Sequence, residues 1–303
     1  MFGTGTVEEV KTVYSFACDI GGTNLRIAIV DSDGKIYLKR KFSTPKKQDK
    51  LFENISQEFE KMNEKFEISH CIFSIAGAVF EDGSVLIPNV FPQRIKLKEA
   101  IRSFIPNVQI YIIDDRTAGL IGEICSGCAR GFKEVAYLII GTGVGLGIFS
   151  QGQIIFGNQG IAGSAGWIHI KDPLTEEYRD IESLISGPAI AKMFSRICGK
   201  EIESSESVLR LYLQKNTCAT EVVKNVSFAI GYLLSTITNI LNPEIIVLSG
   251  SVGLNWKVFE EEAVKTLKKF TSPFITLPII KVSSLGEDAQ LVGCSKYTSL
   301  RKE

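Results

Sequence analysis

Two segments of the sequence, roughly 120 residues apart, repeat one local pattern: an apolar strand, a glycine turn and a β-hairpin. The first strand runs from Tyr14 to Asp19 and leads into Gly21-Gly-Thr23, and the second runs from Val135 to Ile140 and leads into Gly141-Thr-Gly143. Short apolar runs bounded by glycine are typical of strands, and Asp31-Ser-Asp-Gly34 is a hairpin signal. The repeat predicts two structurally related halves.

Helix and strand patterns alternate after each of these openings. Apolar spacing predicts helices over residues 50–65, 95–104, 222–241 and 254–270, and buried strands at 71–75, 108–113, 244–248 and 279–282. Asn242-Pro243 is expected to end the third helix, and the tail from Glu287 onward has a helical pattern. Because chain termini often lie close together, we predict an α/β protein with a small domain of residues 1–117 plus 286–303 and a large domain of residues 118–285.

The glycine turns have the composition of loops that bind phosphate. Glycine lets backbone N–H groups approach an anion and adopts positive φ without strain. A carboxylate beside such a loop can hold Mg²⁺ directly or through water, as we expect of Asp19. Each turn taken alone is first of all a hairpin turn, so the prediction depends on finding two of them. The expected phosphate contacts are Gly21, Gly22, Thr23, Asn24, Gly141, Thr142, Gly143 and Gly250.

Two common nucleotide-binding motifs are not present in the sequence. No GxxxxGK[ST] segment occurs, which excludes a P-loop. The glycines of Gly143-Val-Gly-Leu-Gly147 alternate along a strand pattern with no helix directly after them, so they are a poor dinucleotide fingerprint.

Two adjacent acids, Asp114 and Asp115, end the strand predicted at 108–113, where a helix pattern begins. One acid at this position is expected to cap the helix, because a side-chain oxygen can accept a hydrogen bond from the first turn. The other can take a proton from a substrate hydroxyl. We assign the cap to Asp114 or Thr117 and the catalytic base to Asp115.

Composition excludes several classes of function. Lys plus Arg and Asp plus Glu both total 34, so the formal charge is zero and no polyanion-binding surface is indicated. No run of 18 apolar residues predicts a membrane span, and the N-terminal segment has no signal-peptide core, so a cytoplasmic protein is expected. Seven scattered cysteines argue against a disulfide framework. Cys125 and Cys128 have CxxC spacing, for which a packed helix segment and a metal or redox pair are the alternatives.

Several segments, in order between residues 14 and 298, resemble the bacterial-type glucokinases and the ROK (repressor, open reading frame, kinase) family. Asp19-Ile-Gly-Gly-Thr-Asn-Leu-Arg26 resembles the family's first phosphate motif and Gly141-Thr-Gly143 its second. Asn242–Gly250 is similar to the adenosine-side segment, and Leu291–Ser295 to the closing helix. The resemblance implies two ribonuclease-H-like (actin-like ATPase) domains, with mixed sheets flanked by helices and an interdomain cleft.

The resemblance also implies roles for individual residues. Asp115 matches the catalytic aspartate, Asn89 a sugar-side asparagine, and Ala76-Gly77 a turn lining the sugar pocket. Glu182 matches an acceptor of sugar hydroxyls. An ordinary turn residue is the alternative for Asn89, and an exposed helix start is the alternative for Glu182.

The sequence departs from the family's pattern in the expected sugar pocket. The family's Gly-Glu-x-Gly-His stretch reads Gly163-Ser-Ala-Gly-Trp167 here, so Ser164 and Trp167 replace the carboxylate and the histidine. Asp114 stands where asparagine is usual, which includes it among the expected substrate contacts. Trp167 offers a stacking face for a sugar ring or an apolar substituent, with core packing as the alternative. The family's zinc cysteines are missing between Lys171 and Asp180, so no zinc is expected.

Together these features predict ATP- and Mg²⁺-dependent phosphorylation of a sugar hydroxyl, with Asp115 as the base. A kinase of an amino sugar or a polyol is an alternative, and a catalytically weak sugar-sensing regulator is another. A regulator is less expected, because only 18 residues precede Asp19 and no nucleic-acid partner is indicated. A non-catalytic ATPase is a further alternative, which Asp115 and Glu182 argue against. A homodimer is expected by analogy alone.

Overall fold

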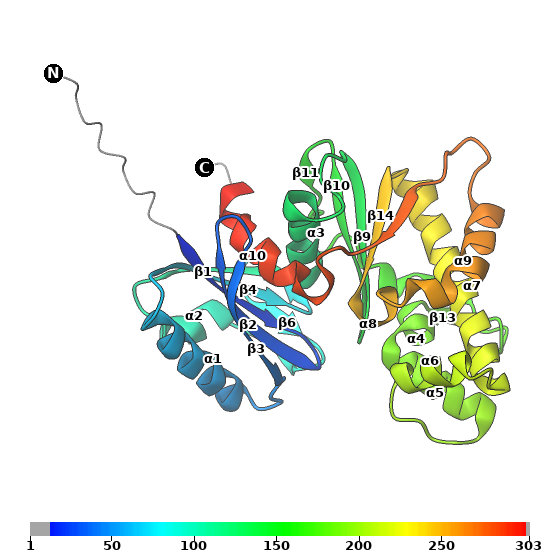
Figure 1. Cartoon of the computed structure of the whole chain (residues 1–303), viewed down its shortest axis with the longest axis horizontal. Coiled ribbons are helices and arrows are strands. Elements are labelled where there is room, and N and C mark those ends of the chain that lie inside the picture. Colours follow the sequence, from blue (N-terminus) through cyan, green and yellow to red (C-terminus); the bar gives the residue numbers. More distant parts are fainter. Residues whose placement is uncertain (1–12, 301–303) are drawn as a thin grey trace.

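The structure, a computed structural model, describes residues 13–300. Two five-stranded sheets of equivalent order, β3-β2-β1-β4-β8 and β11-β10-β9-β14-β15, form its framework (Figure 1). The strands of the first are β1 (Tyr14–Ile20), β2 (Asn24–Asp31), β3 (Ile36–Ser43), β4 (Ile68–Ile75) and β8 (Gln109–Asp114). The strands of the second are β9 (Glu134–Ile140), β10 (Val144–Ser150), β11 (Gln153–Ile154), β14 (Ile245–Ser249) and β15 (Ile279–Val282).

The two sheets have the same mixed pairing. In the first, β1 pairs antiparallel with β2, which follows it after a tight turn. It pairs parallel with β4, which comes later in the chain, after β2, β3 and a helix over residues 48–63. In the second, β9 pairs antiparallel with β10 and parallel with β14. The predicted repeat of strand, glycine turn and hairpin is therefore confirmed, as is the α/β class with two mixed sheets.

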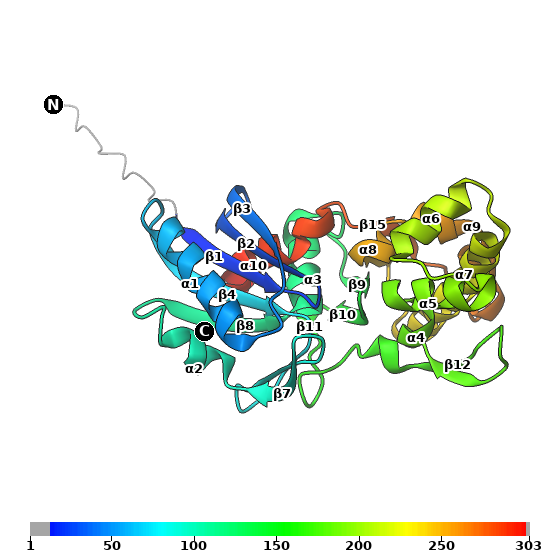
Figure 2. The same ribbon diagram turned by 90° about the horizontal axis from the view of Figure 1, so that it is seen from below.

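Helices flank each sheet (Figure 2). The first half carries α1 (Gln48–Asn63) and α2 (Leu97–Arg102). The second half carries α4 (Glu182–Ile185), α5 (Gly187–Cys198), α6 (Ser205–Leu213), α7 (Thr217–Leu241), α8 (Gly250–Gly253) and α9 (Trp256–Phe270). The helices α3 (Asp115–Ser126) and α10 (Ala289–Leu300) pack on each other, and α10 also contacts β1, β2 and β4. The C-terminal helix therefore lies against the first sheet. The predicted domain boundaries stay a prediction, and residues 1–12 and 301–303 lie outside the described part of the chain.

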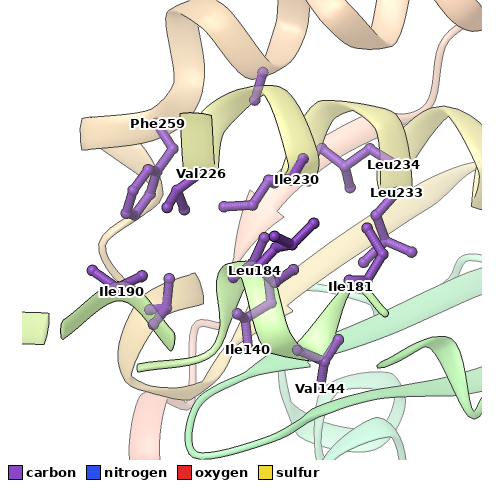
Figure 3. Packing of buried hydrophobic residues seen from close by; sticks show 14 of the residues in the cluster. Ile140, Val144, Ile181, Leu184, Ile190, Val226, Ile230, Leu233, Leu234 and Phe259 are labelled. Carbon is purple, nitrogen blue, oxygen red and sulfur yellow. The ribbon is translucent and has the colours of Figure 1, made fainter. Parts of the chain in front are cut away.

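The largest core cluster lies between the second sheet and α7. Figure 3 shows Ile140 and Val144 facing Val226, Ile230 and the neighbouring leucines of α7, with α4 between them. The apolar spacing of α7 makes this packing possible, since residues three and four apart share one face. Asn216 caps the start of α7 by accepting a hydrogen bond from Ala219 N–H, and Asn242, at φ 45°, ends it next to Pro243 as predicted.

One predicted helix needed correction, and two small sheets were not predicted. The helix expected over 95–104 is limited to α2, because Phe91–Ile95 is strand β7 of a small sheet with β5 (Ala78–Val79) and β6 (Val85–Ile87). Pro92 and the polar residues after it hid this strand, since proline is depleted in strands. The two-stranded ribbon of β12 (His169–Lys171) and β13 (Tyr178–Asp180) was also not predicted. No helix in the described part of the chain is long and apolar enough to cross a membrane.

Candidate active site

The first glycine turn joins β1 to β2. Gly21 N–H donates to the Asn24 carbonyl at 2.9 Å, and the Thr44 hydroxyl donates to the Gly21 carbonyl at 2.7 Å. These bonds fix the turn, and Thr23 and Asn24 are exposed on it. The predicted contacts of this turn therefore share one exposed edge of the sheet.

The second glycine turn joins β9 to β10 and meets the first. Gly141 N–H donates to the Gly143 carbonyl at 2.9 Å, which closes the turn around Thr142. The hydroxyls of Thr23 and Thr142 are 3.2 Å apart. A Cβ added to Gly22 would lie 3.5 Å from Thr142 Cγ2, so the two loops are in van der Waals range. The structure thus brings together the two turns that the sequence places in different halves.

Gly250 packs closely against the end of β9, next to the second glycine turn. It begins α8 with φ +81°, and a Cβ there would lie 2.4 Å from the Ile140 carbonyl oxygen. A residue other than glycine would therefore clash with the end of β9. A Cβ on Gly141 would lie 3.7 Å from Ser251 N, so the residue pair Gly250-Ser251 lies directly behind the second turn.

Asp19 is buried at the end of β1 and is already paired. Its side chain is 2% exposed, and its Oδ2 accepts hydrogen bonds from Arg26 Nη2 at 2.6 Å and Nε at 3.0 Å. Its Oδ1 accepts a hydrogen bond from Ser74 at 2.8 Å. The antiparallel register places Arg26 directly opposite Asp19. Direct coordination of Mg²⁺ by Asp19 does not fit this pairing, whereas contact through water leaves it intact.

The parallel strands β1, β4 and β8 end together, which collects three predicted segments at one edge. Ile20 is in register with Ile75, and Ile75 with Asp114. The segments that follow are the first glycine turn, the Ala76-Gly77 turn and Asp115. Ala76 N–H donates to the Ile20 carbonyl at 3.1 Å, and this bond holds the Ala76-Gly77 turn beside the start of the first glycine turn.

Gly77 and Asn89 lie beside this edge. A Cβ on Gly77 would come within 1.9 Å of the Leu86 carbonyl oxygen, so the turn needs glycine. Asn89 sits in the turn between β6 and β7, and a Cβ on Gly22 would lie 3.0 Å from Asn89 Cβ. Both alternatives for Asn89 agree with this placement, because it is a turn residue that also faces the first glycine turn.

Asp114 caps α3 as predicted. Its carboxylate accepts hydrogen bonds from Thr117 N–H at 3.0 Å, the Thr117 hydroxyl at 2.7 Å and Arg116 Nε at 2.9 Å. Asp114 is 6% exposed. A contact with substrate through Asp114 would have to compete with these three donors, and its assignment to the substrate pocket stays a prediction.

Asp115 is the first residue of α3 and is half-buried. Burial raises the pKa of its carboxyl to about 7, and the nearby charges of Asp114 and Asp19 act in the same direction. Arg116 opposes the shift by its charge and its backbone N–H. A carboxylate with a pKa near neutrality is suited to accept a proton, since the strength of a general base should match the working pH.

Glu182 lies against the second glycine turn. It begins α4 and is exposed, yet its Oε2 accepts a hydrogen bond from Val144 N–H at 2.8 Å. Cβ atoms on Gly143 and Gly166 would lie 2.9 Å and 3.1 Å from that oxygen. Glu182 therefore links the second turn to the segment that carries Ser164 and Trp167.

The side chains of Ser164 and Trp167 differ in what they contact. The Ser164 hydroxyl donates to the Ile161 carbonyl at 2.8 Å and so stabilises its own loop. Trp167 ends a short 3-10 helix (Ala165–Trp167) and is 78% exposed. The alternative that Trp167 packs in the core is therefore wrong, and most of its side chain is open to solvent.

The segment from Lys171 to Asp180, where the family's zinc cysteines are missing, is held by Asp172. Asp172 is fully buried, and its carboxylate accepts hydrogen bonds from Leu174 N–H at 2.9 Å and Arg179 Nη1 at 3.3 Å. Burial opposes ionisation, but the hydrogen bonds from Leu174 N–H and Arg179 and the positive charge of Arg179 lower the pKa of Asp172 overall. Among the described residues, no group of three or more His, Cys, Asp or Glu side chains is placed to hold a metal ion.

Three basic residues of the site were given no role from the sequence. Arg26 pairs with Asp19, and hairpin register alone could have found it. Lys46 donates to the carbonyls of Gly22 at 2.7 Å and Asn89 at 2.6 Å, so it connects the first glycine turn to the turn that carries Asn89. Arg116 follows the candidate base. Nothing in the sequence pattern distinguishes Lys46 or Arg116, because tertiary packing decides what they contact.

Comparison with known proteins gives one consistent family. The ROK family model matches residues 15–299. A glucokinase of Halalkalibacterium halodurans is 23% identical over 313 residues, covering 91% of this chain and 92% of the relative. An N-acetylmannosamine kinase of Vibrio cholerae is 29% identical over 252 residues, covering 79% and 84%.

Solved structures agree on the fold. A ROK glucokinase of Streptomyces griseus in complex with glucose and AMPPNP has a TM-score of 0.80 at 20% identity, covering 94% of this chain and 98% of that one. A ROK transcriptional regulator also has a TM-score of 0.80, at 18% identity, covering 95% and 78%. These likenesses confirm the predicted actin-like fold, and the family match over nearly the whole chain shows that this protein belongs to the ROK family.

Proposed function

We propose that this protein is a sugar kinase that transfers a phosphoryl group from ATP to a sugar hydroxyl. The observation that carries the proposal is the convergence of the two glycine turns, at 3.2 Å between the Thr23 and Thr142 hydroxyls, at the sheet edge where Asp115 follows the end of β8. Backbone N–H groups and hydroxyls on both turns can donate to the phosphates of one nucleotide.

Asp115 is the proposed base. It accepts the proton of the sugar hydroxyl as that oxygen bonds to phosphorus, and its pKa of about 7 leaves much of it ionised at neutral pH. When Mg·ATP is bound, the metal ion neutralises charge on the phosphates. Asp19 would face that ion through water, because Ser74 and Arg26 already hold its carboxylate. Glu182, Asn89 and Trp167 are proposed to hold and orient the sugar.

The sugar is proposed to be a hexose or an N-acetylated hexosamine. The relatives support both, since a glucokinase and N-acetylmannosamine kinases are among them. The Ser164 hydroxyl already donates to the Ile161 carbonyl, and Trp167 exposes an indole ring. These two positions therefore offer a sugar fewer polar contacts than the carboxylate and histidine of the family's pattern. Stacking on the indole is therefore proposed to take part of the role of the missing carboxylate and histidine.

A screen of ADP release over hexoses, amino sugars and polyols tests the proposal. We expect release that depends on one sugar class and on Mg²⁺. The variant Asp115→Ala should fold and bind ATP but lose at least ~100-fold in kcat, the usual share of a general base. Near-normal kcat in this variant would reject the role of Asp115. Absence of sugar-dependent ADP release, together with a gel shift on DNA upstream of the gene, would favour a sugar-sensing regulator instead.

A further inference from the structure

Arg116, the residue after the candidate base, is almost fully buried and makes two different polar contacts. Its exposure is 9%, and its Nε donates to Asp114 Oδ1 at 2.9 Å. Its Nη1 donates to the Ala162 carbonyl at 3.2 Å. Asp114 ends the first sheet, whereas Ala162 belongs to the loop after the second hairpin. One side chain therefore bridges the two halves of the chain next to Asp115.

The glycines of β10 make room for this bridge. A Cβ on Gly145 would lie 2.6 Å from Arg116 Cδ and 2.8 Å from Cγ. A Cβ on Gly147 would lie 2.8 Å from the Arg116 carbonyl oxygen. The alternating glycines that make a poor dinucleotide fingerprint thus have a structural purpose, since they let the start of α3 and the Arg116 side chain lie directly on the strand.

The loop that Arg116 contacts carries the sugar-side residues. Gly163 follows Ala162, and its carbonyl accepts a hydrogen bond from Leu146 N–H at 2.9 Å. Ser164 and the short helix ending at Trp167 come next. The Ala162 carbonyl is therefore the point at which this loop is attached to the helix of the candidate base.

Arginine suits this position better than lysine. Its planar guanidinium can donate in two directions at once, to a carboxylate and to a carbonyl, whereas an ammonium group is a compact point charge. The other charges near the start of α3 are Asp115 itself and Asp19, and Asp19 is paired with Arg26. Arg116 is thus free to neutralise Asp114 rather than Asp19.

We propose that Arg116 is a positioning residue that couples the base-bearing start of α3 to the sugar-side loop at residues 155–164, beyond its pairing with Asp114. This inference rests on the proposed kinase function for its catalytic consequence. A displacement of about 1 Å between base and acceptor can cost roughly 100-fold in rate, which sets the size of the expected effect.

The test compares Arg116→Met, Arg116→Lys, Asp114→Asn and the double variant Asp114→Asn/Arg116→Met. The double variant leaves no unpaired buried charge, so it keeps the proposal testable where Arg116→Met does not fold. Lys61→Met is the matched control, because Lys61 pairs at 2.7 Å with the buried Glu58 on α1, away from the site. Each variant is assayed for kcat and for the KM of sugar and of ATP.

We expect kcat of Arg116→Met and of the double variant to fall about 100-fold relative to Asp114→Asn, with the KM of ATP within about threefold. Arg116→Lys should recover part of the loss, and Lys61→Met should keep the wild-type kcat. The proposal is overturned if the double variant has the kcat of Asp114→Asn, since Arg116 would then act only by neutralising Asp114.

Hydrogen exchange of residues 155–165 gives a readout that needs no catalysis. The double variant should exchange at least about tenfold faster there than Asp114→Asn, because a fixing hydrogen bond is lost and local opening becomes easier. Lys61→Met should not change this loop. Unaltered exchange in the double variant would refute the coupling of Arg116 to this loop, even if the enzyme is active. A wild-type protein that is inactive on every sugar would refute the proposed kinase function. In that case the exchange measurement alone would still test whether Arg116 fixes the loop.

Discussion

The hydroxyls of Thr23 and Thr142 lie 3.2 Å apart, although 119 residues separate them in the sequence. Each threonine lies in the turn that follows the first strand of its sheet. Two hydroxyls that bond to each other can instead donate to a common acceptor placed between the turns. Under the proposed function, a phosphate chain bound between the turns would be held from both sides at this pair.

Removal of the Thr142 hydroxyl should weaken ATP binding. We expect Thr142→Val to raise the KM of ATP about tenfold, because a hydrogen bond to a charged group contributes about 1.5 kcal/mol or more. The free energy of unfolding should change little, since Thr142 is exposed. Steady-state kinetics with varied ATP measure the effect, and Thr220→Val on α7 is a control in which an exposed threonine hydroxyl is lost elsewhere. An unchanged KM of ATP would argue against a phosphate contact at this turn.

The pH dependence of the reaction should follow the ionisation of Asp115. Its pKa is raised to about 7 by burial and by Asp114 and Asp19, and only the ionised form can accept a proton. We therefore expect kcat/KM to fall about tenfold per pH unit below about pH 7. Asp114→Asn should move this limb to lower pH, because it removes a neighbouring negative charge. A rate that stays constant down to about pH 5.5 would rule out a base with this pKa.

The same shift predicts a stability effect with a defined sign. A carboxyl whose pKa is raised in the folded state resists ionisation there, so folding loses stability as the pH rises from about 4 to about 7. Asp115→Asn removes this cost and should raise the free energy of unfolding by about 2 to 4 kcal/mol at pH 8. Denaturant unfolding at pH 8 and at about pH 4 measures it, and the gain should vanish at the lower pH. A gain of equal size at both values would point to another cause.

Tryptophan fluorescence should report sugar binding at Trp167. The chain has two tryptophans, and Trp256 is 6% exposed whereas Trp167 is 78% exposed. A sugar that stacks on Trp167 removes water from the indole, so we expect a blue shift of emission on titration with the best substrate. Trp167→Phe should abolish that shift and change the unfolding free energy by less than about 0.5 kcal/mol, as is usual for exposed positions. A shift that survives this substitution would place the sugar elsewhere.

The loop between β12 and β13 should depend on Asp172 and not on zinc. Asp172→Asn leaves Arg179 without its ionic partner and weakens the buried bonds to the loop, so we expect a loss of about 2 kcal/mol in the free energy of unfolding. Because the pKa of Asp172 is lowered, its contribution is present at neutral pH and is lost as the pH falls below about 4.

Chelator treatment separates this loop from a metal site. Dialysis against a strong zinc chelator should leave the midpoint of thermal unfolding unchanged. Stoichiometric zinc in metal analysis, or a fall in that midpoint after dialysis, would contradict the prediction that the loop needs no metal.

The sequence itself determined the two halves and most of their elements. An apolar run that ends in glycine can be recognised locally, so β1, β9 and the turns after them were predicted, as was the cap at Asp114. Strands with weak local signals were not predicted. β7 contains Pro92, and β12 and β13 are three residues each, so their pairing is decided by partners distant in the chain.

Tertiary structure alone decided which side chains face one another. No local pattern shows that Thr23 meets Thr142, that Arg116 reaches Ala162, or that Trp167 is exposed rather than packed. The physical reason is that backbone preference and apolar spacing act over a few residues, whereas these contacts depend on how two sheets and the helix between them pack. The sequence supplied the chemical groups of the site, and packing fixed their distances and the pKa of Asp115.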